Sequence, residues 1–197
     1  MEVQKIGYTK IILSQNSREF TNIVAMFSNT ISDHTVKNIW QIQNSVLWER
    51  YNRQKDQMKS KTLSSTVNER QLFHGTYLAN IDAICRESFD WRICGTNGGE
   101  YGQGSYFARD ALYAHKCSPV GSLGTRTMFV ARVLVGHFSN GNPTLRRPPQ
   151  KYGSSETYDS CVDNVYNPSV FVVFEKQQAY PEFMVEYEER KTPCIVN

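Results

Sequence analysis

His74 and Gly75 lie where an apolar run ends and a helical pattern begins. The segment 71–85, QLFHGTYLANIDAIC, reads as a strand followed by a helix, with the histidine at the junction. An imidazole at the end of a buried strand needs a hydrogen-bond partner, because an unpaired polar group in the interior is costly. On its own the pair is more typical of a turn glycine beside a core histidine that bonds a backbone carbonyl. A binding role therefore needs support from other residues.

A second candidate follows a glycine-rich loop. The loop, residues 94–104 (CGTNGGEYGQG), lacks both GxGxxG and the GK[ST] of a P-loop, and it leads into a strand rather than a helix. Both common phosphate-binding motifs are therefore excluded. Tyr106 comes next, with the small residues Ser105 and Ala108 beside it. Its ring offers a flat surface for stacking an aromatic ligand, with the hydroxyl free for a hydrogen bond, although a core tyrosine has the same signature.

The length and composition of the chain are typical of one globular domain with a small net charge. The chain has 197 residues, of which 40% are hydrophobic and 21% charged, and its formal net charge is +3. That charge is too small to indicate nucleic-acid binding, although it would not repel a phosphate-bearing ligand. The basic stretch TLRRPPQK is read as a solvated loop. No segment approaches the roughly 18 apolar residues of a membrane span, and the N-terminus has no apolar signal-peptide core.

The cysteines are odd in number and widely spaced, without a CxxC pair. This pattern argues against a disulfide framework and against a zinc site. It indicates reduced thiols, and hence a cytoplasmic or nuclear location without a bound metal. The cysteines are Cys85, Cys94, Cys117, Cys161 and Cys194.

Residue periodicity predicts an α+β domain with predominantly antiparallel sheets. The first helix would begin with a capping box formed by Asn16 and Glu19. The second would bury a stripe of Leu47, Tyr51 and Met58. No internal repeat or second domain is apparent, so residues 1–197 are read as one domain. Strands are expected over 9–14, 36–43, 70–74, 105–108, 127–138, 168–175 and 182–188, and helices over 16–30, 45–61, 81–85 and 109–116.

Several segments, taken in order, resemble one known family. They are LFHGT, YGQGSYFARDA, MFVARVLVG, RRPP, YDSCVDN and NPSVFVVFEKQQAYPEF. They resemble the catalytic domain of the poly(ADP-ribose) polymerase family, the diphtheria-toxin-like ADP-ribosyltransferases. The chain looks most like the mono-ADP-ribosylating branch with the CCCH zinc-finger members, the dioxin-inducible member and the zinc-finger antiviral protein. The resemblance implies an ADP-ribosyltransferase fold, antiparallel sheets flanked by short helices, without the helical regulatory domain of the DNA-damage-activated members.

The resemblance also implies a binding site for NAD as co-substrate. His74 would contact a ribose hydroxyl, the backbone of Gly75 would hold the nicotinamide carboxamide, and Tyr106 would stack on the nicotinamide ring. An acceptor side chain would displace nicotinamide through an oxocarbenium-like transition state, which requires orientation and electrostatic stabilisation but no metal. The other residues that match the NAD-binding pattern are Thr76, Gly104, Ser105, Phe107, Ala108, Ala114 and Cys117.

Three positions depart from the family pattern. Val170 stands where polymer-forming members carry a catalytic glutamate, near the start of the strand SVFVVF. Ala114 replaces a serine that binds the carboxamide, and Cys117 replaces an aromatic ring over the opposite face of the nicotinamide. The neighbouring Tyr113 and His115 are expected to point elsewhere on their helix. A valine cannot activate the hydroxyl of a growing chain, so polymer synthesis is not expected.

Two functions remain open. The first is an NAD-dependent mono-ADP-ribosyltransferase that modifies protein acceptors, itself included. The second is a catalytically inactive domain of the same fold that serves for binding or scaffolding in an RNA-binding, antiviral-type protein. Intact His74 and Tyr106 favour the enzyme, whereas Ala114, Cys117 and Val170 favour the inactive domain. Neither function gives this domain a membrane or nucleic-acid partner, and RNA binding would belong to upstream domains.

Overall fold

The computed structural model describes residues 7–62, 64–92 and 99–191. Within these ranges, nine strands form one sheet in the order β1-β2-β9-β5-β3-β4-β8-β7-β6. Neighbouring strands run antiparallel except β6 and β7, which run parallel. The predicted α+β class and the antiparallel pairing are confirmed, and the strands belong to a single sheet.

The predicted elements occur in the predicted order along the chain. The strands are β1 (Thr9–Ile12), β2 (His34–Gln43), β3 (Glu69–Gly75), β4 (Ser105–Ala108), β5 (Thr125–Leu134), β6 (Phe138–Asn140), β7 (Ser160–Val162), β8 (Val170–Val173) and β9 (Ala179–Glu189). The helices are α1 (Arg18–Ser28), α2 (Ser45–Thr62), α3 (Ile81–Glu87) and α4 (Ala111–His115), with 3-10 turns at Leu78–Asn80 and Lys176–Gln178.

The long strand predicted over 127–138 is divided in the structure. Strand β5 ends at Leu134, and Gly136 turns the chain with φ at 59° before β6 begins. Strand β7 was not predicted at all. Strands β6 and β7 have only three residues each, too few to show a period of two in the sequence.

Helix α1 begins with a different cap from the one predicted. Ser17 is the N-cap, and its Oγ accepts a hydrogen bond from the backbone N–H of Phe20 at 3.2 Å. Asn16 precedes the cap, so the predicted capping box of Asn16 and Glu19 is wrong. Serine and asparagine have similar preferences for this position, which is why the sequence did not separate them.

Strand β5 separates two hydrophobic clusters. Met128 and Val130 pack with α1 and α4, whereas Phe129 and Ala131 pack with α3 on the opposite face. Alternate residues of a strand point to opposite faces, so one central strand serves both layers. Helix α2 covers the far end of the sheet through a third cluster, which contains the predicted stripe of Leu47, Tyr51 and Met58.

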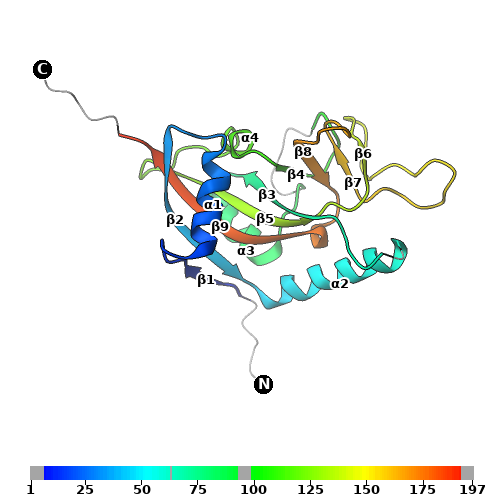
Figure 1. Ribbon diagram of the computed structural model, residues 1–197, viewed down its shortest axis with the longest axis horizontal. Helices are drawn as coiled ribbons and strands as arrows, with labels where there is room; N and C mark the ends of the chain where they lie inside the picture. The colour runs from blue at the N-terminus through cyan, green and yellow to red at the C-terminus, as the bar shows by residue number, and fades with distance from the viewer. Residues whose placement is uncertain (1–6, 63, 93–98, 192–197) are drawn as a thin grey trace, which may run out of the picture.

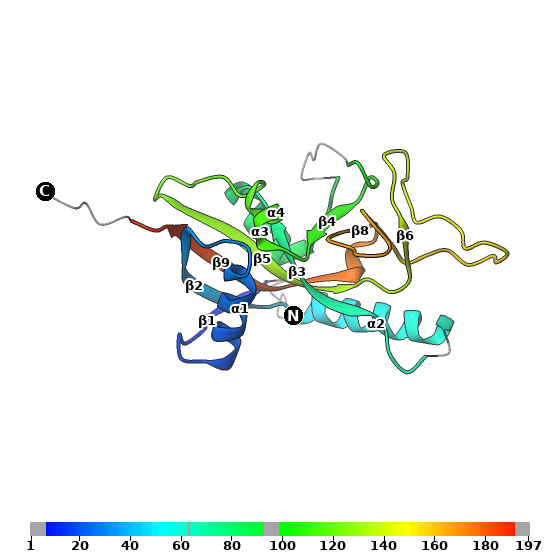
Figure 2. The same ribbon diagram turned by 45° about the horizontal axis from the view of Figure 1, so that its top comes forward.

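Two views show how the helices are distributed. Helix α1 lies toward the C-terminal end of β9, and α2 lies toward the opposite end of the molecule (Figures 1 and 2). The long connection between β6 and β7 projects outward at the α2 end, beyond the sheet.

The sheet is least continuous between β3 and β4. Strand β3 pairs with β5 along its whole length, from Glu69 to Gly75, but it meets β4 at one pair, Phe73 with Ala108. Strand β4 in turn pairs along its whole length with β8. The sheet therefore divides into two halves, and the strand ends at this division carry His74 and Tyr106.

Candidate active site

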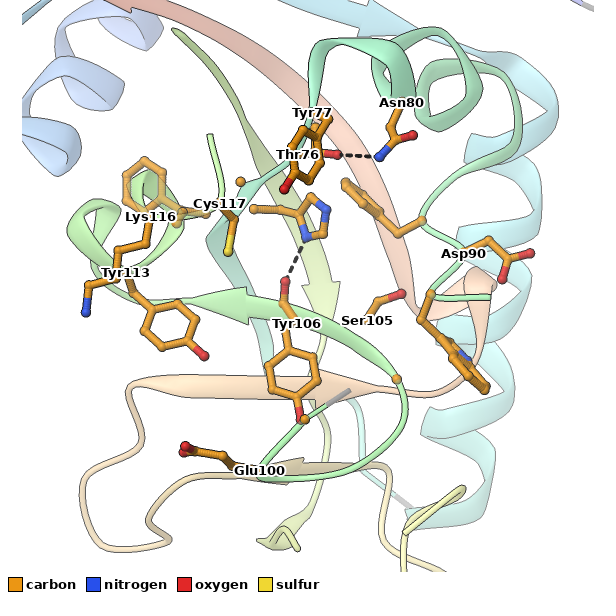
Figure 3. A pocket seen from close by; sticks show the side chains of 18 residues that line it. Thr76, Tyr77, Asn80, Asp90, Glu100, Ser105, Tyr106, Tyr113, Lys116 and Cys117 are labelled. Carbon is orange, nitrogen blue, oxygen red and sulfur yellow. Dashed lines mark hydrogen bonds between the residues drawn. The ribbon is translucent and has the colours of Figure 1, made fainter. Parts of the chain in front are cut away.

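A cavity of about 480 Å³ lies at the division of the sheet (Figure 3). Its walls come from the end of β3, the segments that follow β3 and α3, the loop before β4, β4 itself and α4. A volume of this order suits a small-molecule site.

Most of the residues selected from the sequence line this cavity. Phe107 does not, because it is buried and packs against the His74 ring at a centroid distance of 5.3 Å. Ala108 and Val170 are also outside the lining, where they pair with each other across β4 and β8. The selected residues that line the cavity are His74, Gly75, Thr76, Gly104, Ser105, Tyr106, Ala114 and Cys117.

His74 is held as a neutral imidazole. Its Nδ1 lies 2.7 Å from the backbone carbonyl oxygen of Tyr106. A carbonyl oxygen only accepts, so Nδ1 carries the proton and donates, which leaves Nε2 as an acceptor. Burial lowers the pKa of His74 to about 4, although the bond to Tyr106 acts in the opposite direction. At neutral pH the ring can therefore accept a hydrogen bond from a ligand hydroxyl.

We expect the free energy of unfolding to fall as the pH is lowered from about 6.5 to about 4. Folded His74 stays neutral over this range, because its pKa is about 4. In the unfolded chain the ring takes up a proton near pH 6.5, so the unfolded state binds more protons and acid favours unfolding. The difference between the two pKa values corresponds to roughly 3 kcal/mol.

Melting temperatures measured from pH 7 to pH 4 test this expectation. His74→Phe, which has no ionisable ring at this position, is the control. Its melting temperature should fall by fewer degrees than that of the wild type over the same pH range. Parallel curves for the two proteins would contradict a buried neutral His74.

Gly75 allows α4 to approach β3. A Cβ atom at this position would lie 1.9 Å from the carbonyl oxygen of Ala114 and 2.9 Å from Oγ of Ser118. Only glycine fits such a contact. The glycine thus has a packing role, and this role brings the backbone of β3 and Ala114 together in one wall of the cavity.

Tyr106 supports the loop that precedes it. Its hydroxyl donates to the carbonyl oxygen of Gly102 at 2.7 Å and accepts from the N–H of Tyr101 at 3.1 Å. A Cβ atom on Gly99 would lie 1.4 Å from the same hydroxyl oxygen, so the chain crosses directly over it. The expectation of a free hydroxyl is therefore wrong, and it is the ring of Tyr106 that lines the cavity.

Tyr113 also lines the cavity, contrary to the expectation from the sequence. Cys117 follows the end of α4, and it lines the same cavity as Tyr113. Figure 3 shows the Tyr113 side chain reaching toward Tyr106. Burial raises the pKa of Tyr113 to about 12, so its hydroxyl stays protonated at neutral pH. His115 does point elsewhere, and its Nδ1 lies 2.9 Å from the Tyr187 hydroxyl.

The segment after α3, which forms part of the cavity wall, contains an aspartate that is paired with two basic side chains. Asp90 accepts hydrogen bonds from Nε of Arg92 at 2.9 Å and from Nζ of Lys176 at 2.8 Å. The Arg92 bond, aided by Lys176, holds the pKa of Asp90 far below its usual range. No short motif marks this cluster, because Lys176 is distant in the chain.

Ser88 sets the path of the backbone where α3 ends and this part of the cavity wall begins. Among the described residues it is the one non-glycine with a positive φ, 67°, in a region that otherwise suits glycine. Its Oγ donates to the carbonyl oxygen of Ala179 at 2.8 Å, which anchors the turn to β9. The turn places the Phe89 ring against His74 at a centroid distance of 4.7 Å.

Val170 shares a sheet face with Tyr106 but not the cavity. Antiparallel pairing places Val170 opposite Ala108 and Val172 opposite Tyr106, and directly opposed residues point to the same side. Val170 is only 3% exposed. Its N–H donates to Oδ1 of Asp163 at 3.1 Å, so the nearby acid serves the turn that enters β8.

The described ranges hold no group of three or more His, Cys, Asp or Glu side chains arranged to bind a metal ion. Nor does any helix in them have the length and apolar character to span a bilayer. Cys85, Cys117 and Cys161 are free thiols, while Cys94 and Cys194 lie outside the described residues.

The fold and the cavity together define a catalytic domain of the ADP-ribosyltransferase type. The family model described as the poly(ADP-ribose) polymerase catalytic domain matches residues 17–154, well over half of the chain. The chain therefore belongs to this family, as its motifs predicted. Strands β7, β8 and β9 follow the matched range and complete the same sheet.

Several relatives match nearly the whole chain. It is 48% identical over 190 residues to human protein mono-ADP-ribosyltransferase PARP12, covering 96% of the chain and 27% of that relative. It is 38% identical over 202 residues to mouse protein mono-ADP-ribosyltransferase PARP11, covering 92% of the chain and 61% of that relative. It is 33% identical over 192 residues to human protein mono-ADP-ribosyltransferase PARP14, covering 95% of the chain and 11% of that relative. The chain thus spans less than two thirds of each of these relatives.

Proposed function

We propose that this domain is an NAD-dependent mono-ADP-ribosyltransferase, which transfers one ADP-ribose to a protein side chain and releases nicotinamide. The observation that carries the proposal is the cavity in which neutral His74, Gly75 and Tyr106 meet at the division of the sheet. The activity named for the relatives supports it. Proteins, including this chain itself, are the proposed acceptors.

The lining chemistry suits NAD. Tyr106 and Tyr113 offer aromatic surfaces for a nicotinamide ring, and Nε2 of His74 can accept a hydrogen bond from a ribose hydroxyl. Lys116 adds positive charge for a diphosphate. Tyr113 also weakens the case for an inactive domain, since it offers an aromatic ring near the position where Cys117 lacks one.

Incubation with NAD labelled in its adenosine part tests the proposal. The purified chain should gain label on a denaturing gel and release nicotinamide, and the labelled band should show no ladder. A ladder of increasing size would contradict mono-ADP-ribosylation. If there is neither label nor released nicotinamide, the inactive scaffold is the better assignment.

We expect Ala114→Ser to tighten nicotinamide binding by roughly tenfold, which corresponds to about one recovered hydrogen bond. Ala114 is buried in the cavity wall beside Gly75, where a hydroxyl could reach the carboxamide. Nicotinamide that binds only the native state raises the melting temperature with ligand excess, so thermal titration gives both affinities. Equal affinities would contradict this placement of Ala114.

We expect Tyr113→Ala to weaken nicotinamide binding by about 2- to 12-fold, the value of one lost aromatic stack. Tyr113→Phe keeps the ring and should bind as the wild type does. Leu112→Ala, on the exposed side of α4, is the matched control. The same thermal titration measures all three variants, and full affinity in Tyr113→Ala would remove this residue from the site.

A further inference from the structure

Cleavage of a glycosidic bond develops positive charge on the sugar, and enzymes commonly stabilise that charge with a carboxylate. Val170 cannot provide one. We propose that Glu100, in the loop before β4, stabilises this charge and acts as a catalytic residue of the transfer reaction. The proposal deepens the function proposed above and rests on it.

The other carboxylates near the cavity already have partners. Asp90 lines it, but Arg92 and Lys176 bind both of its oxygens. Asp163 lies beside β8, where it accepts hydrogen bonds from both the N–H and the hydroxyl of Ser169. Within the described residues, Asp90 and Glu100 are the carboxylates in the lining. Glu100, which is exposed, is therefore the lining carboxylate without a cationic partner among the described residues, and its hydrogen bond is with the neighbouring Tyr101.

Bonds to Tyr106 fix the backbone of Glu100. The residue before it, Gly99, leaves no room for a Cβ beside the Tyr106 hydroxyl. The residue after it, Tyr101, donates its N–H to that hydroxyl at 3.1 Å. Both neighbours of Glu100 thus contact the outer end of the Tyr106 ring, and they hold the glutamate at the edge of the stacking surface.

The side chain of Glu100 lines the outer edge of the cavity, at the hydroxyl end of Tyr106. In Figure 3 it extends on the same side of Tyr106 as Tyr113. Burial raises the pKa of both Tyr106 and Tyr113, and the charge of Glu100 acts in the same direction as the smallest of the contributions at each. A hydrogen bond with Glu100 also helps to raise the pKa of Tyr101, after burial. A carboxylate has about four acceptor positions, so others remain for a ribose hydroxyl.

The role of Glu100 in the reaction is electrostatic. The bond from the anomeric carbon to the nicotinamide nitrogen breaks, and its electron pair stays on that nitrogen. A lone pair of the acceptor side chain forms the new bond to carbon, and the acceptor proton passes to solvent. Glu100 forms no covalent bond. Its carboxylate accepts a hydrogen bond from a ribose hydroxyl and opposes the developing positive charge.

Glu100→Gln tests the proposal because it keeps the shape of the side chain and removes the charge. The kcat for nicotinamide release should fall about 100- to 1,000-fold. The KM for NAD, the affinity for nicotinamide and the melting temperature should stay close to those of the wild type. Glu100→Asp, which keeps the charge on a shorter side chain, should retain more activity than Glu100→Gln. Glu49→Gln, in an exposed ion pair with Arg53 on α2, is the matched control and should keep full kcat.

The possible results separate this proposal from the proposed function. If the wild type is active and Glu100→Gln keeps its kcat, Glu100 has no catalytic role but the transferase assignment stands. If kcat falls together with nicotinamide affinity and melting temperature, the residue only supports the loop, and the proposal fails. An inactive wild type would overturn both.

Discussion

Tyr106→Ala is expected to lower ADP-ribose transfer by at least about 100-fold, because even a small misplacement of the reacting groups can cost this much. The substitution removes the ring on which nicotinamide is proposed to stack. It also leaves the N–H of Tyr101 and the carbonyl oxygen of Gly102 without their shared partner, so the loop loses its support. Steady-state nicotinamide release measures the effect.

Tyr106→Phe separates the two roles of this residue. It keeps the ring and removes only the hydroxyl, so its activity should lie between those of the wild type and Tyr106→Ala. A transfer rate of Tyr106→Ala within threefold of the wild-type rate would exclude the ring from the site. A threefold difference corresponds to only about 0.6 kcal/mol in activation free energy.

Gly75→Ala is expected to destabilise the domain by about 3 kcal/mol or more. This value is at the upper end of the range observed when extra atoms are forced into a packed core. The added methyl group would meet the backbone of Ala114 at 1.9 Å, and a backbone carbonyl cannot turn aside as a flexible side chain can. For a chain of this length the melting temperature should fall by roughly 10 °C. Nicotinamide binding should be lost with it, because α4 must move out of the cavity wall.

Thermal unfolding of soluble Gly75→Ala measures this effect. A variant that melts within about 2 °C of the wild type would mean a change below about 1 kcal/mol, and hence that α4 does not approach β3 as closely as described.

The sequence predicted the parts of the fold that carry a repeating pattern. The strand predicted over 70–74 is present as β3, one residue longer at each end, and the stripe of Leu47, Tyr51 and Met58 is buried as predicted. Strands β6 and β7 were missed, because three residues carry no measurable period. Pairing between β6 and β7 depends on contacts between segments distant in the chain.

The candidate site was predictable only where a motif marked it. His74, Gly75 and Tyr106 stand in such motifs, and all three line the cavity. Tyr113 was placed wrongly, because the orientation of a five-residue helix depends on how it packs. Glu100 lies in an irregular loop whose position depends on the hydroxyl of Tyr106, so no local pattern could reveal it.

Mass spectrometry of peptides from the chain after incubation with NAD tests the assignment of a mono-ADP-ribosyltransferase most directly. It reads both the presence of transfer and the number of units at each acceptor side chain. We predict that every modified peptide carries a single ADP-ribose and that Tyr106→Ala yields none. Peptides that carry chains of ADP-ribose, or an unmodified wild type under conditions in which NAD binds, would contradict the assignment.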